Sequence, residues 1–122
     1  SIANPLSEIL DIEGIAGVAH EAGVPLIVDN TVASPYLIRP LEWGADIVVH
    51  SATKYIGGHA NALGGAVTET GIFDWSSFTN LFDDYKRGAP ANWAITQIKK
   101  KGLRDFGAAL APEGGSSYLG RS

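Results

Sequence analysis

The chain has 122 residues, of which 45% are hydrophobic and 18% charged, a composition typical of one globular domain. Its formal net charge of −4 argues against nucleic acid or an anionic membrane as a partner. It has no cysteine, which excludes disulfides and thiolate metal sites, and no apolar run approaches the roughly 20 residues that span a bilayer. No signal peptide is visible, so we expect a cytoplasmic protein. Because methionine is absent, we expect part of a longer protein, with a processed mature chain as the alternative.

The first predicted element is an amphipathic helix over residues 11–22, where apolar residues recur every three or four positions. Asp11 is a suitable N-cap, because its short side chain accepts a hydrogen bond from the first turn. Gly23 suits a left-handed C-cap, and Pro25 prevents the helix from continuing.

Three strands are predicted next. The runs "LIVD" at 26–29 and "ADIVVH" at 45–50 lack polar alternation, which favours strands buried on both faces of a parallel sheet. The residues between them, with one helical turn at 40–43, suffice for a crossover. A third strand is expected at 63–69, and it is entered through glycines.

Beyond the strands, residues 74–87 are expected to form a loop with helical turns, and residues 93–111 a longer helix. The alternation of helices and buried strands predicts an α/β fold.

Two of the predicted strands lead into polar residues. Asp29 ends the first, and Ser51, Thr53 and Lys54 follow the second. Because ligands bind at the carboxyl ends of parallel strands, we expect these side chains to share one pocket. A lysine in a partly apolar pocket is a good nucleophile and forms a Schiff base with an aldehyde.

Pyridoxal 5′-phosphate (PLP) is an aldehyde that would use all of these groups. A carboxylate keeps its ring nitrogen protonated, and hydroxyls with backbone N–H groups bind its phosphate. Each residue also has an ordinary explanation: an aspartate is often a turn former, a lysine is often solvated, and hydroxyl residues often cap turns. It is the combination that favours a PLP site.

The sequence also resembles a known family. The segments "SIANP" and "DIEGIAGVAHEAGVPLIVDNTVASPYLIRPLEWGADIVVHSATKYIGGH", with the "GG" before the third strand, resemble the Cys/Met-metabolism PLP enzymes over residues 1–75. The resemblance resumes at "ITQIKKKGLRDFGAALAP". It implies an α/β fold: part of the large PLP-binding domain of a fold type I, aminotransferase-like enzyme, with a mainly parallel sheet flanked by helices.

The resemblance further implies how this incomplete PLP-binding domain is divided. Residues 1–75 would form the core with the cofactor site, and residues 76–94 a loop region that is shorter than usual in the family. Residues 95–111 would form a helix, and residues 112–122 a tail to which we assign no function.

The resemblance also implies the site residues. Lys54 would be catalytic, since it would hold PLP covalently and later transfer protons. Asp29 would pair with the pyridine nitrogen, Ser51 and Thr53 would bind the phosphate, and Asn4 would bond the ring hydroxyl. The aromatic residue that stacks on the ring and the arginine that binds the substrate carboxylate are expected outside this chain.

Within the family, "YIGGHANALGG" is most like the O-acetylhomoserine sulfhydrylases, which exchange acetate for sulfide to give homocysteine. The alternative is a cystathionine γ-synthase or lyase, or methionine γ-lyase, which more often carry "SGH" and then an acidic residue. The alternative from another class is a non-catalytic, truncated relative. The family also implies a homotetramer that takes a small amino-acid substrate and sulfide.

Other candidate sites are less well supported. His50 and His59 flank Lys54, but no third ligand stands at a suitable spacing, so no metal site is predicted. We expect His59 to structure its loop, and His20 to be a surface residue of the first helix. The glycines near Lys54 match neither a dinucleotide-binding fingerprint nor a Walker loop.

Overall fold

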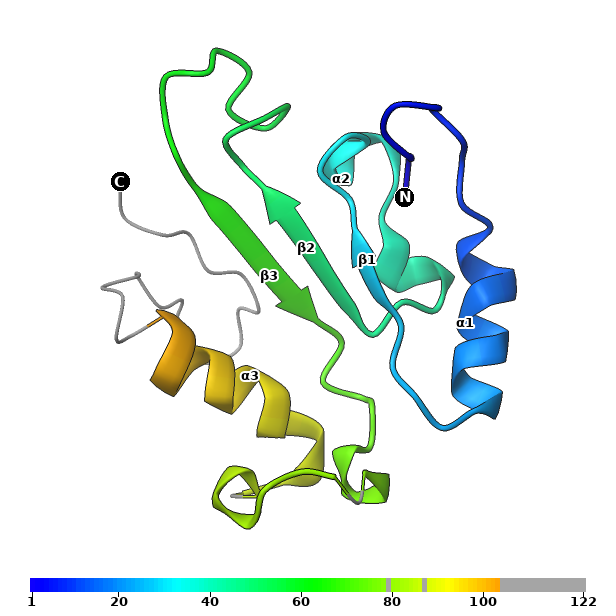
Figure 1. Cartoon of the computed structure of the whole chain (residues 1–122), viewed down its shortest axis with the longest axis vertical. Helices are drawn as coiled ribbons and strands as arrows, with labels where there is room; N and C mark the ends of the chain where they lie inside the picture. The colour runs from blue at the N-terminus through cyan, green and yellow to red at the C-terminus, as the bar shows by residue number, and fades with distance from the viewer. Residues whose placement is uncertain (79, 87, 104–122) are drawn as a thin grey trace.

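The computed structural model describes residues 1–78, 80–86 and 88–103 (Figure 1). Strands β1 (Ile27–Asp29), β2 (Ile47–Ser51) and β3 (Gly65–Glu69) form one sheet in the order β1-β2-β3. The pair β1 and β2 is parallel, whereas β2 and β3 are antiparallel, so the sheet is mixed. The predicted α/β class is therefore confirmed. Strand β3 reverses direction because the loop over residues 52–64 returns directly, without a crossover.

Helix α1 (Ile12–Glu21) confirms the helix predicted over residues 11–22. Asp11 is its N-cap, and the Asp11 carboxylate accepts a hydrogen bond of 3.0 Å from the N–H of Gly14. At the other end Gly23 has a φ of 70°, a left-handed conformation that glycine adopts at no steric cost.

The connection from β1 to β2 contains a short helix, α2 (Ser34–Leu37), and the 3-10 helix η1 (Pro40–Trp43). The turn predicted at 40–43 is thus confirmed. The sequence did not predict α2, whose first residue, Ser34, has a φ of 60°. Pro35 follows directly, and its fixed φ suits the first turn of a helix.

After β3 the described chain forms short 3-10 turns over Trp75–Ser77, Asp83–Tyr85 and Pro90–Asn92. Helix α3 (Trp93–Gln97) follows and continues as a π-helical segment, Ile98–Leu103. These residues cover the first part of the helix predicted over 93–111, and the remainder lies outside the described residues. No helix of the described chain is long and apolar enough to cross a membrane.

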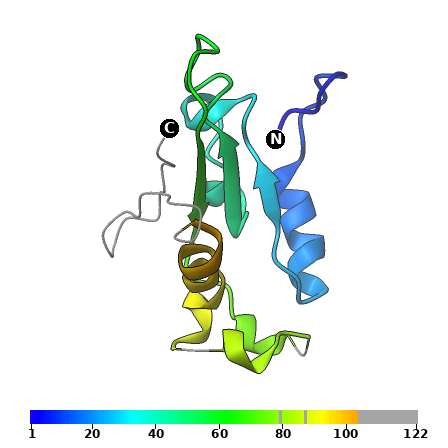
Figure 2. The ribbon, with the colours of Figure 1, turned by 60° about the vertical axis from the view of Figure 1, so that its left-hand side comes forward.

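The core lies on one face of the sheet, where Ile12 of α1 packs with Val28, Ala45 and Val48. Figure 2 shows α1 on this side of the strands. Ile27, which points to the other face, is 56% exposed. The prediction that β1 is buried on both faces is therefore wrong for the described residues, because they do not cover the second face of this strand.

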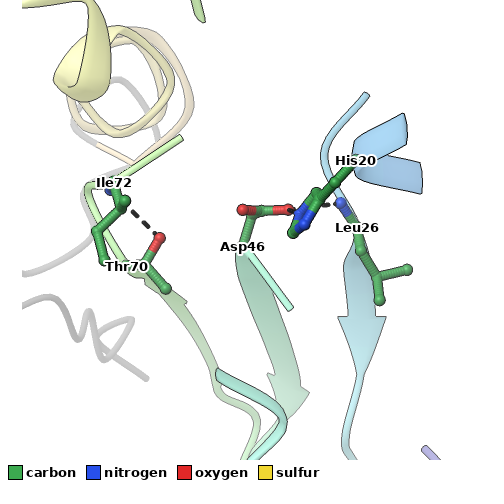
Figure 3. A network of polar contacts seen from close by, with 5 residues as sticks. All are labelled: His20, Leu26, Asp46, Thr70 and Ile72. Carbon is green, nitrogen blue, oxygen red and sulfur yellow. Dashed lines mark hydrogen bonds and ion pairs between the residues drawn. The ribbon is translucent and has the colours of Figure 1, made fainter. Parts of the chain in front are cut away.

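His20 joins α1 to the beginning of β2 (Figure 3). Its Nε2 lies 2.8 Å from Oδ2 of Asp46, and the same oxygen accepts a hydrogen bond of 2.8 Å from the N–H of Leu26. Asp46 is 8% exposed, so its carboxylate is stabilised mainly by these two partners. The prediction that His20 is a surface residue is confirmed, since the residue is exposed. Its contact with Asp46 was not predicted, because the two residues approach each other only in the folded chain.

Candidate active site

The candidate site lies where β1 and β2 end. Because the two strands are parallel and Asp29 pairs with Val49, their C-terminal ends meet at one edge of the sheet. The N-terminal segment passes beside this edge (Figure 1), and Ser1 donates a hydrogen bond of 2.6 Å from its amino group to the carbonyl oxygen of Asp29. Segment and strand ends together enclose an open cleft of about 990 Å³.

Four of the five predicted site residues line this cleft: Asn4, Asp29, Ser51 and Lys54. Asn4 comes from the N-terminal segment, Asp29 and Ser51 are the last residues of β1 and β2, and Lys54 lies in the turn that follows β2. A carboxylate, a hydroxyl, an amide and an amine thus face one space. The juxtaposition of Asp29 with Lys54 that the sequence predicts is therefore present in the structure.

Lys54 is held in a tight turn. Its backbone N–H donates to the carbonyl oxygen of Ser51 at 3.2 Å, and its own carbonyl oxygen accepts from the N–H of Gly58 at 2.8 Å. The side chain of Lys54 is exposed. The sequence predicts a partly apolar pocket around this amine, but the described residues do not enclose it.

Thr53 is placed differently from the other predicted residues, since it is not among those that line the cleft. Its Oγ1 accepts a hydrogen bond of 3.0 Å from the N–H of Gly64 and donates one of 3.3 Å to the carbonyl oxygen of the same residue. These bonds tie the turn that carries Lys54 to the residue before β3. A phosphate-binding role for Thr53 stays a prediction.

Thr31 links the two strand ends. Its Oγ1 accepts a hydrogen bond of 2.8 Å from the backbone N–H of Ser51. The hydroxyl and the backbone N–H of Thr31, the latter at 2.9 Å, both donate to the Asp29 carboxylate. Asp29 and Ser51 are therefore joined through a single side chain.

These hydrogen bonds also set the charge of the site. The bonds from Thr31 are the largest causes that lower the pKa of Asp29 below its ordinary value of 3.8, and the nearby His50 acts in the same direction. Asp29 is thus ionised at neutral pH. A carboxylate in this state can pair with a protonated ring nitrogen.

Asn30 and His50 lie behind the cleft. Asn30 is fully buried, and its Nδ2 lies 2.8 Å from the carbonyl oxygen of Ile38 and 3.1 Å from Nε2 of His50. Burial lowers the pKa of His50, although the negative charge of Asp29 opposes this shift.

From the sequence alone, no role is predicted for Asn30 or Thr31, and His50 is a candidate only as a metal ligand. A usable signal was their position, since Asn30 and Thr31 directly follow the strand-end Asp29. Among the described residues no group of three or more His, Cys, Asp or Glu side chains is placed to hold a metal ion. His59 makes a local contact, with Nδ1 lying 3.1 Å from the carbonyl oxygen of Gly57, as expected for a loop-structuring residue.

The donor set fits PLP. The ionised Asp29 suits a pyridinium nitrogen, Ser51 offers a hydroxyl to a phosphate, and the Lys54 amine suits an aldehyde. Asn4 adds an amide on the side of the N-terminal segment. An α/β sheet with these groups at one edge defines the class of a PLP-binding protein.

The family follows from direct comparison. The model of the Cys/Met metabolism PLP-dependent enzymes matches residues 1–119. The chain belongs to this family, whose cofactor is PLP.

Two curated relatives illustrate the similarity. The chain is 46% identical over 125 residues to the sulfhydrylase FUB7 of Gibberella moniliformis, and the match covers 92% of this chain and 29% of that protein. It is 39% identical over 130 residues to the O-acetyl-L-homoserine sulfhydrylase of Leptospira meyeri, with the same two coverages.

The chain is also similar to a solved structure. The cystathionine gamma-lyase from Lactobacillus plantarum, complexed with L-serine, is 49% identical and superposes with a TM-score of 0.53 over 55% of this chain and 18% of that chain. The chain therefore spans less than a third of the length of each of these three proteins.

Proposed function

We propose that the intact protein that contains this chain is a PLP-dependent transferase that converts O-acetylhomoserine and sulfide into homocysteine and acetate. The observation that carries the proposal is the meeting of Asp29 and Lys54 in one cleft at the ends of parallel strands. The similarity to a protein named O-acetyl-L-homoserine sulfhydrylase supports the choice of substrate.

The residues of the cleft would divide the work. Lys54 would hold the cofactor covalently through Nζ. After the substrate amine has displaced Lys54 from the cofactor, the freed Nζ of Lys54 would move the proton at the substrate α carbon. Asp29 would orient the ring through its nitrogen, Ser51 would bind the phosphate, and Asn4 would bond the ring hydroxyl. Thr53, which does not line the cleft, would join Ser51 at the phosphate. When bound, PLP supplies an electron sink for the negative charge left at the α carbon.

The overall replacement is balanced. The bond between the γ carbon and the acetate oxygen breaks, a bond between this carbon and sulfur forms, and one proton of hydrogen sulfide is released with the acetate. We expect Lys54 to carry the protons that leave and return to the substrate carbon atoms, because among the residues that line the cleft it has the side-chain amine.

The role of Lys54 can be tested by its covalent attachment to the cofactor. The intact protein, loaded with PLP, would be reduced with borohydride, digested and analysed by peptide mass spectrometry. We expect the cofactor mass on the peptide of Lys54, and no such adduct in the Lys54→Ala variant. A wild-type protein without the adduct would favour the non-catalytic, truncated relative.

The substrate is tested by competition between thiols. The intact protein would be incubated with O-acetylhomoserine and either sulfide or cysteine, and the products would be separated by chromatography. Homocysteine is the expected product. The cystathionine γ-synthase or lyase activity, or that of methionine γ-lyase, is the second candidate because of the 49% identity to a cystathionine gamma-lyase. Preferential formation of cystathionine, or cleavage of methionine supplied in a separate incubation, would favour it.

We also infer that the intact protein is a cytoplasmic homotetramer without nucleic-acid or membrane partners. The absence of cysteine from this chain fits a reducing compartment, and its net charge of −4 does not favour a polyanionic partner. Light scattering on the purified intact protein tests the tetramer, and cell fractionation tests the compartment.

A further inference from the structure

Asn30 is the polar residue that the fold buries most completely beside the candidate site. It is 0% exposed, and it follows Asp29 directly in the chain. Its Oδ1 is buried, and no group of the described residues hydrogen-bonds to it, which carries a free-energy cost that an apolar side chain would not have. The two contacts of Nδ2 must therefore explain why an amide occupies this place.

The orientation of the Asn30 amide follows from chemistry. The carbonyl oxygen of Ile38 can only accept a hydrogen bond, so the amide must turn its Nδ2 toward that oxygen, at 2.8 Å. An amide nitrogen has two hydrogens and no acceptor. The second hydrogen is left for Nε2 of His50, at 3.1 Å.

The protonation of His50 is then determined. Because Asn30 donates to Nε2, this nitrogen must carry a lone pair, and the single proton of the neutral ring must lie on Nδ1. The burial of His50 favours the same neutral form, since it lowers the pKa of the ring against the opposing charge of Asp29.

The pair also connects the ends of the two strands. Asn30 comes directly after Asp29, and His50 comes directly before Ser51. In addition, the backbone N–H of Asn30 donates to the carbonyl oxygen of Val49 at 2.9 Å, which extends the parallel pairing by one residue. The contact between Asn30 and His50 thus lies behind both residues that face the cleft.

We propose that Asn30 is a positioning residue, which holds His50 as the Nδ1–H tautomer and clamps the end of β2 to the end of β1. The clamp fixes the spacing between Asp29 and Ser51 on the cleft side. This inference rests on the proposed PLP site, and it concerns residues that do not line the cleft.

The tautomer of His50 is the direct test, and it is measured in the wild-type protein. The intact protein would be labelled with ¹⁵N-histidine, and the signal of His50 would be assigned by its loss in His50→Gln. We expect the ¹⁵N shifts of a neutral ring with its proton on Nδ1 at neutral pH. A wild-type ring protonated on Nε2, or on both nitrogens, would overturn the proposal.

The positioning role is tested by PLP binding to the apoprotein, measured as a dissociation constant. Glutamine retains an acceptor for Asn30, so His50→Gln should bind PLP nearly as well as the wild type. Because His50→Leu removes the acceptor, it should bind about tenfold more weakly. The proposal fails if His50→Leu and His50→Gln bind PLP equally well.

A second variant reverses the polarity of the contact. In Asn30→Asp a carboxylate would face Nε2 of His50, so the proton should move onto Nε2 and PLP binding should weaken by about tenfold. An unchanged tautomer in a variant that unfolds at the wild-type temperature would contradict the clamp. If wild-type protein does not bind PLP at all, the proposed function fails, whereas the tautomer measurement still decides whether Asn30 controls His50.

Discussion

The most informative single change at the candidate site is Thr31→Val, because valine keeps the shape of threonine and removes only its hydroxyl. The hydroxyl accepts from the backbone N–H of Ser51 at 2.8 Å and donates to the carboxylate of Asp29. Both hydrogen bonds are lost in the variant. Asp29 keeps the bond from the backbone N–H of residue 31, at 2.9 Å.

The expected magnitude follows from these two bonds. Each contributes about 0.5–1.5 kcal/mol net, and water replaces part of this at a site that is open to solvent. Because Asp29 and Ser51 both face the proposed cofactor, we expect the loss to appear in PLP binding as about 1–2 kcal/mol. This corresponds to a dissociation constant about 5- to 30-fold higher.

The pH dependence should change as well. The ordinary pKa of Asp29 is 3.8, and the hydroxyl of Thr31 is the largest cause that lowers this pKa in the folded chain. The ionised carboxylate therefore stabilises the folded chain above pH 3.8, and this stabilisation is lost as the pH falls through the lowered pKa of the folded state. Without the hydroxyl the pKa rises, and PLP binding should start to decline at a higher pH than in the wild type.

The assay is titration of the intact apoprotein with PLP at several pH values, with Thr31→Ser as the matched control. Serine retains the hydroxyl, so its dissociation constant and pH profile should stay close to those of the wild type. If Thr31→Val bound PLP as tightly as the wild type over the whole pH range, the hydroxyl would not connect the strand ends, and the reasoning would be refuted.

Three further predictions concern stability and are measured by thermal unfolding of the intact protein. Asp46→Ala should destabilise by about 3 kcal/mol, because the carboxylate accepts two hydrogen bonds of 2.8 Å, and Asp46→Asn should lose less. Gly57→Ala should lower both stability and PLP binding, since its Cβ would lie 2.8 Å from the carbonyl oxygen of Ala52, in the turn that holds the lysine. By contrast, Gly17→Ala should stabilise by about 1 kcal/mol, because on the exposed side of α1 its Cβ would meet no other described residue within 4 Å.

The sequence predicted the features that depend on short-range patterns. The helix that became α1 was identified by its period and its cap at Asp11, and the strands by their apolar runs. The edge shared by Asp29 and Lys54 followed from one further rule, that parallel strands end on the same side. Local patterns and topology together thus predicted that Asp29, Ser51 and Lys54 meet at one edge of the sheet, whereas the roles of these residues stay predictions.

Contacts between distant residues could not be predicted in this way. His20 and Asp46 are 26 residues apart, and Thr31 and Ser51 are 20 apart, so neither pair has a signal in local periodicity. The degree of enclosure was also missed. An apolar run indicates that a strand can be buried, but whether both faces are covered depends on elements elsewhere, and Ile27 is 56% exposed in the described chain.

The last residue of β1, Asp29, and the two residues that follow it show why one short motif can serve two purposes. Side chains alternate between the faces of a strand, so Asp29 and Thr31 line the cleft while Asn30 between them points into the buried side. Asp29 and Thr31 place a charge and hydrogen-bonding groups where a ligand would lie. Asn30 fixes the backbone that carries these two residues by its hydrogen bond to His50. A one-residue shift would bury the carboxylate and expose the amide. The pairing of Asp29 with Val49 therefore sets the register on which the chemistry of the cleft depends.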